Sequence, residues 1–171
     1  MTKRFDRRKE DRIHFASAMT LLGYNDGASA ITGVSYLHIA EFIMRHGARP
    51  DDDLQELWRR IVFNICISNS DDHLRNHGFL LTPKGWVLSP AFDINPIPSS
   101  TGLSLNISEY SNALDLDLAS EVAEKFRVTE KKREAIIDKV TKTASRWQEV
   151  AAGVGISRNE MQQMEHTFLI R

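Results

Sequence analysis

Hydrophobic residues recur at the spacing of a buried helix face along residues 51–69, the most strongly patterned part of the chain. The stripe consists of Leu54, Leu57, Trp58, Ile61, Val62, Ile65 and Cys66. Positions three and four residues apart share one face of an α-helix, so the pattern predicts a long helix packed against a core. Aspartates at 51–53 suit the positive end of the helix dipole and indicate a solvated helix start.

Shorter stripes of the same period predict further helices. They cover residues 11–22, 35–46, 118–126, 129–150 and 157–168. The last of these helices opens with a capping-box pattern, a serine followed three residues later by a glutamate. Most of the chain is therefore expected to be helical.

Two short apolar runs around a Pro–Gly turn predict a β-hairpin. The runs lie at 79–81 and 86–88, and the turn lies at 82–85. Residues 103–107 alternate between apolar and polar side chains, which predicts one short strand. The patterns together predict a mainly α fold with a small β-hairpin, in a single domain over residues 1–171.

Composition narrows the class of protein. The 171 residues are 42% hydrophobic and 26% charged, as in globular domains, and the formal net charge of −1 predicts no direct nucleic-acid binding. The single cysteine, Cys66, lies in an apolar run and indicates a buried, reduced thiol. No apolar run approaches eighteen residues and no charged-then-apolar leader opens the chain, so we expect a cytoplasmic protein without a membrane span.

The candidate chemistry lies directly after the long helix. Asp71 precedes Asn76 by five residues, and Asp93 follows seventeen residues later, beyond the predicted hairpin. Kinases need a carboxylate near the attacking hydroxyl and oxygen ligands for magnesium, and they show this Asp-to-Asn spacing. The spacing selects Asp71 over Asp72. Because a hairpin brings its ends together, Asn76 and Asp93 are expected to converge.

Two other interpretations fit the same residues. The first is a polar turn between helix and hairpin, whose side chains bond to the backbone. The second is a metal-dependent hydrolase site, with ligands drawn from Asp71, Asp72, His73, His77 and Asp93. It requires the two histidines to share a helix face. Gly78 and the polar composition of the loop argue against a helix there.

Specific segments resemble a known family. Residues 70–79 (SDDHLRNHGF) and 88–96 (LSPAFDINP) resemble the active-site segments of the HipA family. These are bacterial serine/threonine kinases that serve as toxins of toxin–antitoxin pairs. Residues 3–7 (KRFDR) and 13–15 (IHF) resemble the segment that joins the two kinase lobes. The resemblance covers most of residues 1–100 and implies the C-terminal lobe of a protein-kinase-like, HipA-like fold.

The resemblance also implies ATP and Mg²⁺ as cofactors and suggests a role for each matching position. Asp71 would be the catalytic base, and Arg75 would support it as a cation near the transferred phosphate. Asn76 and Asp93 would hold Mg²⁺. The residues that would contact the nucleotide are Lys3, Phe5, His73 and Phe92.

Partners follow from the resemblance as expectations. They are a HipB-like DNA-binding antitoxin and a protein substrate such as glutamyl-tRNA synthetase. Family members are much longer, and their nucleotide-binding N-terminal lobe would precede Met1, so a separate N-terminal-lobe polypeptide is a further expected partner. The sequence contains no glycine-rich phosphate loop before the site and no strand lysine of the V-A-I-K type. We therefore expect no activity without that lobe, and a non-catalytic interaction module is the alternative.

Overall fold

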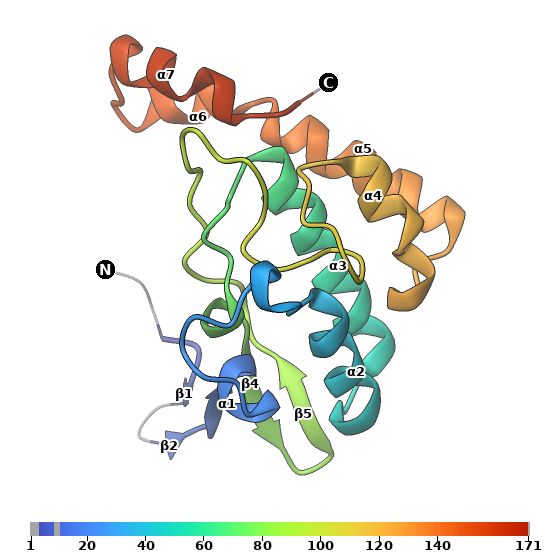
Figure 1. Ribbon diagram of the computed structural model, residues 1–171. Helices are drawn as coiled ribbons and strands as arrows, with labels where there is room; N and C mark the ends of the chain where they lie inside the picture. Colours follow the sequence, from blue (N-terminus) through green and yellow to red (C-terminus); the bar gives the residue numbers. More distant parts are fainter. Residues whose placement is uncertain (1–3, 9–10, 171) are drawn as a thin grey trace.

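The computed structural model describes residues 4–8 and 11–170, and about half of the chain is helical (Figure 1). The α-helices are α1 (Ala18–Leu22), α2 (Tyr36–His46), α3 (Pro50–Cys66), α4 (Leu116–Glu121), α5 (Glu130–Ala144), α6 (Trp147–Gly153) and α7 (Arg158–Met164). Short 3-10 helices cover Ala30–Thr32, Leu74–Asn76, Ala123–Phe126 and Glu165–Thr167. The strands are β1 (Arg7–Arg8), β2 (Asp11–Arg12), β3 (Phe15–Ser17), β4 (Gly78–Thr82) and β5 (Gly85–Leu88).

Helix α3 is the central element, as the hydrophobic stripe predicts. It packs against α2 on one side and against α4 and α5 on the other (Figure 1). The seven residues of the stripe are all buried. The indole N–H of Trp58 donates to the carbonyl of Ala119 at 2.8 Å, which ties α3 to α4. Proline at the first helical position suits the helix start, since its missing N–H has no partner there in any case.

The predicted hairpin is confirmed and gains a third strand. Strands β4 and β5 pair in antiparallel register, with Leu81 opposite Trp86, and β3 pairs with the other edge of β4. The sheet lies at one end of α3, and α6 and α7 lie at the other end (Figure 1). Hydrogen bonds of Leu88 to Asp53 and of Ser89 to Arg60 hold the open end of the hairpin alongside α3.

The helix predicted over residues 11–22 is mostly wrong. Only Ala18–Leu22 is helical, and residues 15–17 form β3. The three-residue spacing of apolar side chains fits a helix, but pairing with β4 satisfies the backbone of residues 15–17 instead. Ser17 then caps α1 through its hydroxyl, which accepts from the amide of Thr20 at 3.3 Å.

All three predicted C-terminal helices are divided in two. The last of them consists of α7, which ends at Met164, and the 3-10 helix Glu165–Thr167. A 3-10 helix, Ala123–Phe126, follows α4, and α5 ends at Ala144 before α6 begins at Trp147. The ring of Trp147 stacks in parallel on Phe168, with centroids 4.1 Å apart. That contact with the last segment needs a change of direction after Ala144, which one continuous helix does not allow.

The region predicted as a strand at 103–107 forms only an isolated bridge. Asn106 pairs with Ser35, and residues 103–107 are otherwise irregular. Leu103, Leu105 and Ile107 are nevertheless buried. The alternating pattern therefore indicated correctly which side chains are buried, although this segment does not belong to a sheet. Among the described residues, no helix combines the length and apolar character needed to cross a membrane.

Alkylation of Cys66 is expected to be slow in the folded protein. The side chain is fully buried, and burial raises the pKa of its thiol to about 11. Only the thiolate reacts, and a free cysteine has a pKa near 8.5, so iodoacetamide at pH 8 should modify the native thiol at least ~100-fold more slowly than the unfolded one. Mass spectrometry with and without urea measures both rates. Equal rates would contradict the buried position.

Candidate functional site

The end of α3 directs the chain into the site. Ser68 adopts a left-handed conformation (φ 51°) that stops the helix. The side-chain amide of Asn69 donates to the Asn64 side-chain oxygen at 3.0 Å, and the backbone N–H of Asn69 donates to the Asn64 backbone carbonyl at 2.9 Å. Because Asn64 is buried within α3, these bonds attach the loop that follows to the most rigid part of the fold.

Asp72 is the buried anchor of that loop. One of its carboxylate oxygens accepts hydrogen bonds from the Tyr36 hydroxyl at 2.6 Å and from the Asn64 side-chain amide at 2.6 Å. The same oxygen is hydrogen-bonded to the Nε2 atom of His77 at 3.0 Å. Only 3% of Asp72 is exposed. The loop is thereby joined to both α2 and α3.

The same network sets the ionisation of its members. Burial alone raises the pKa of Asp72, but the nearby His77, the hydrogen bonds from His77 and Tyr36, and the charge of Arg60 outweigh it and lower that pKa overall. Burial, and then the Asp72 carboxylate, raise the pKa of the Tyr36 hydroxyl well above its usual value. Asp72 is therefore an ionised acceptor that joins these buried side chains, which is a structural role.

Asp71 has the opposite environment. Asp71 is exposed. Its backbone carbonyl accepts hydrogen bonds from the His73 backbone N–H at 3.0 Å and from the Asn76 side chain at 3.4 Å. The backbone of Asp71 is thus fixed and its carboxylate faces solvent. This is a geometry in which a bound hydroxyl can reach the carboxylate.

The hairpin does bring Asn76 and Asp93 together. The side-chain Nδ2 atom of the buried Asn76 donates to the Asp93 carbonyl at 3.2 Å and to its carboxylate at 3.3 Å. The other carboxylate oxygen of Asp93 accepts from Asn95 at 3.1 Å. Asp93 has a left-handed backbone (φ 56°), which is uncommon outside glycine but tolerated by aspartate. The Asn76 nitrogen faces Asp93 in this arrangement. With the amide turned to present its oxygen, the two side chains would supply the oxygen ligands that Mg²⁺ prefers.

Three phenylalanines form an apolar cluster in the same region. Ring centroids of Phe5 and Phe92 are 5.8 Å apart, and Phe15 lies 5.9 Å from Phe5 and 6.2 Å from Phe92. With Arg4 and Asp6 they line an open cavity of about 300 Å³. A planar base could bind against these rings, so the residues fit a nucleotide.

Phe15 is the member of this cluster that sequence reasoning did not assign. It lies in segment 13–15, whose resemblance to the lobe-joining segment was the available signal. The β4 glycine Gly78 leaves room for it, because a Cβ there would lie 2.2 Å from the Phe15 ring. At the cavity rim Arg4 pairs with Asp6 at 2.6 Å, and this hydrogen bond holds the pKa of Asp6 at about 2.

The remaining predicted site residues are less closely grouped. Lys3 lies outside the described residues. His73 is half-buried, and its Nδ1 atom is buried without a hydrogen-bond partner in the part of the chain that the structure describes. Arg75 is 44% exposed and forms an ion pair with Asp26, on the loop after α1. Its role near a phosphate remains a prediction.

The geometry does not support a hydrolase site. His77 is 1% exposed, and its Nε2 atom is bonded to Asp72. Its Nδ1 atom has no hydrogen-bond partner in the described part of the chain, but it is buried away from the exposed Asp71 and Asp93. A 3-10 helix, Leu74–Asn76, separates His73 from His77, so the two do not share an α-helix face. Across residues 4–8 and 11–170, no three His, Cys, Asp or Glu side chains gather as a metal cluster.

Sequence comparison identifies the family. The model of the HipA-like C-terminal domain matches residues 1–147, so the chain belongs to that family. A Haemophilus influenzae protein named "Putative kinase" is 33% identical and aligns over 60% of this chain and 34% of its own length. A Sinorhizobium fredii protein named "Putative kinase Y4dM" is 29% identical over 86% of this chain and 36% of its own. The chain spans about a third of the length of these relatives.

Structural comparison confirms the HipA-like fold. A chain in the solved complex of Shewanella oneidensis HipA, HipB and operator DNA superposes with a TM-score of 0.68. The match covers 96% of this chain and 45% of that one, at 21% identity. At this identity the likeness concerns the fold alone.

Proposed function

We propose that this chain is the catalytic C-terminal lobe of a HipA-like serine/threonine protein kinase. The reaction is Mg²⁺-dependent transfer of a phosphoryl group from ATP to a protein hydroxyl. One observation carries the proposal: the side chains of Asn76 and Asp93 are in contact, with Asn76 Nδ2 3.3 Å from the Asp93 carboxylate. Asn76 follows the exposed Asp71 by five residues. The match to kinase spacing and the adjacent aromatic cavity agree with it.

Each residue has a definite task in this mechanism. Asp71 orients the substrate hydroxyl and accepts its proton. Asn76 and Asp93 would hold Mg²⁺ through oxygen, and Mg²⁺ when bound offsets charge on the phosphates. The rings of Phe5, Phe15 and Phe92 hold the adenine ring of ATP and exclude water from one side of it.

Partners complete the proposal. The solved complex of a structurally similar protein contains HipB and operator DNA, which supports a HipB-like antitoxin as partner. By family resemblance the substrate is a protein, with glutamyl-tRNA synthetase as the example. A nucleotide-binding lobe with a glycine-rich loop and a lysine must come from another segment or polypeptide, since catalysis here depends on positioning and charge.

Transfer of labelled phosphate from ATP to a generic protein substrate tests the function. The 171-residue chain alone is expected to show no transfer, because its sequence shows no strand lysine of the V-A-I-K type to pair with the α and β phosphates. Adding a polypeptide that carries the glycine-rich loop and the lysine should restore it. Strong Mg²⁺-dependent transfer by the chain alone would show that this lobe is not needed. A folded two-lobe complex without transfer would favour the non-catalytic interaction module.

A further inference from the structure

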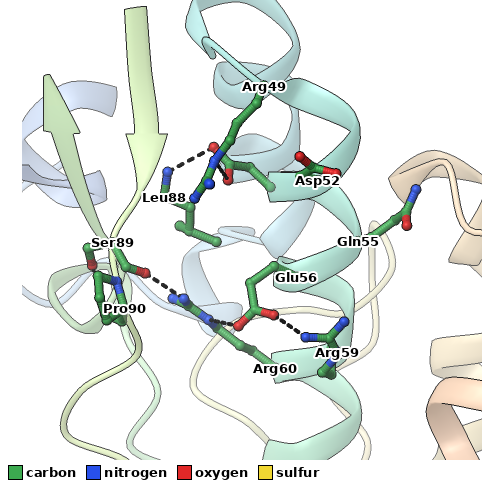
Figure 2. A pocket seen from close by; sticks show the side chains of 10 residues that line it. Arg49, Asp52, Gln55, Glu56, Arg59, Arg60, Leu88, Ser89 and Pro90 are labelled. Carbon is green, nitrogen blue, oxygen red and sulfur yellow. Dashed lines mark hydrogen bonds and ion pairs between the residues drawn. The ribbon is translucent and has the colours of Figure 1, made fainter. Parts of the chain in front are cut away.

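Two buried side chains of α3 hold the backbone of the segment that leads from β5 to Asp93 (Figure 2). The Asp53 carboxylate accepts from the Leu88 amide at 2.9 Å, and the Arg60 guanidinium donates to the Ser89 carbonyl at 2.6 Å. Asp53 is 1% exposed and Arg60 is 7% exposed. We call these two side chains and their two backbone partners the α3 clamp.

Each side chain of the clamp is fixed by a second partner one helical turn away. Arg49 donates to the other Asp53 oxygen at 2.9 Å, and the Nε atom of Arg60 donates to Glu56 at 3.1 Å. Arg60 therefore bonds two different acceptors at once, through Nε and Nη2. A lysine in its place has no such fixed fork and cannot keep both bonds in this geometry.

The clamp and the Ser89 amide form the last hydrogen bonds to other elements before the proposed metal ligand, although the Phe92 ring also packs against Phe5 and Phe15. The Ser89 amide also donates to the Gly78 carbonyl at 2.8 Å, whereas Pro90 and Ala91 are exposed. Among the hydrogen bonds of the described residues, the next that joins this segment to another element is the contact of Asn76 with Asp93. The clamp therefore fixes the start of the short segment that ends at Asp93, and the packing of Phe92 fixes the residue before Asp93, whose backbone is left-handed.

Stability alone accounts poorly for Arg60. Its Nη1 atom is buried without a hydrogen-bond partner in the described part of the chain. Burying a charge is costly, and a buried ion pair is often no more stabilising than apolar side chains of similar volume. Its charge also favours the ionised form of the buried Asp72, and its direct hydrogen bonds are to Glu56 and to the Ser89 carbonyl. Of these contacts, only the bond to Ser89 reaches the segment that leads to Asp93.

We propose that Arg60 is a positioning residue for Asp93, acting through Ser89, with Asp53 as the second half of the clamp. The proposal rests on the proposed role of Asp93 as a Mg²⁺ ligand. It assigns to α3 a second task besides forming the core: the helix that carries the Asp71 loop at its end also sets the position of Asp93 from its side.

Arg60→Met and its neighbour Arg59→Met form a matched pair of variants. Arg59 shares Glu56 with Arg60, at 2.6 Å, but is half-exposed and lies away from Ser89 (Figure 2). The NMR chemical shifts of the backbone amides of Phe92, Asp93 and Ile94 report the conformation of this segment, and they can be measured in an inactive protein. We expect Arg60→Met to move these resonances and Arg59→Met to leave them unchanged.

The second readout uses the proposed two-lobe kinase, which is this chain together with the polypeptide that carries the glycine-rich loop and the lysine. Arg60→Met should raise the Mg²⁺ concentration at half-maximal transfer about tenfold, as expected for loss of a hydrogen bond to a charged group near a metal site, with KM for the protein substrate unchanged. Asp53→Asn, which keeps an acceptor for the Leu88 amide, should be milder. If Arg60→Met does not fold, Arg60→Lys gives the same two readouts.

The outcomes separate the two proposals. Unmoved resonances at residues 92–94 in a folded Arg60 variant, or equal shifts in Arg59→Met, would overturn the clamp. Moved resonances in a protein whose wild-type form transfers no phosphate would retain the clamp as a structural device and reject the kinase function.

Discussion

Replacing Asp71 with alanine is expected to abolish phosphoryl transfer by the two-lobe kinase while leaving the fold intact. A positioned general base contributes 10²–10⁴-fold to rate, so we expect a loss of about 10³-fold or more. Asp71 is exposed, so the free energy of unfolding should change by no more than about 0.5 kcal/mol. Transfer rates under saturating ATP and Mg²⁺, with urea unfolding of the same samples, measure both quantities.

The control for this variant is an exposed aspartate far from the site. Asp138→Ala, on α5, removes a carboxylate that is 74% exposed and should leave transfer unchanged. In the same assay Asn76→Ala and Asp93→Ala should weaken Mg²⁺-dependent nucleotide binding as well as transfer. Near-normal transfer by Asp71→Ala would show that another group is the base.

Replacing Asp72 with alanine is expected to have the largest effect on stability. The change leaves the Tyr36 hydroxyl, the Asn64 amide and the His77 ring without their shared acceptor in the core. Removing one member of a buried charged network costs about 3–5 kcal/mol, so the variant should unfold at much lower urea concentration. Asp71→Ala is the neighbouring control, and equal midpoints for the two variants would contradict the network.

The stability that Asp72 contributes should also depend on pH. Its pKa is lowered in the folded protein, so the contribution is fully present above the pKa of an unfolded aspartate, about 4. It is lost as pH falls through the lower, folded value. The difference in unfolding free energy between wild type and Asp72→Ala should therefore shrink as the pH falls below about 4.

The sequence alone determined the elements whose signals are local. The stripe of α3, the flanks of α2 and the turn of the hairpin each lie within a few residues of one another. The convergence of Asn76 and Asp93 also followed, because closing a hairpin fixes the distance between its ends. The spacing further distinguished Asp71 from Asp72 as the candidate base.

Tertiary structure decided the features that depend on distant partners. Residues 15–17 form β3 because their backbone groups pair with those of β4, which lies more than sixty residues away in the sequence. Asp53 looked like part of a solvated helix start, yet the Leu88 amide and Arg49 hold it in the core. Periodicity shows which face of a helix is apolar, but it cannot show which polar side chain meets a backbone group brought from elsewhere. For that reason the buried role of Asp72 and the α3 clamp could be found only once the chain was folded.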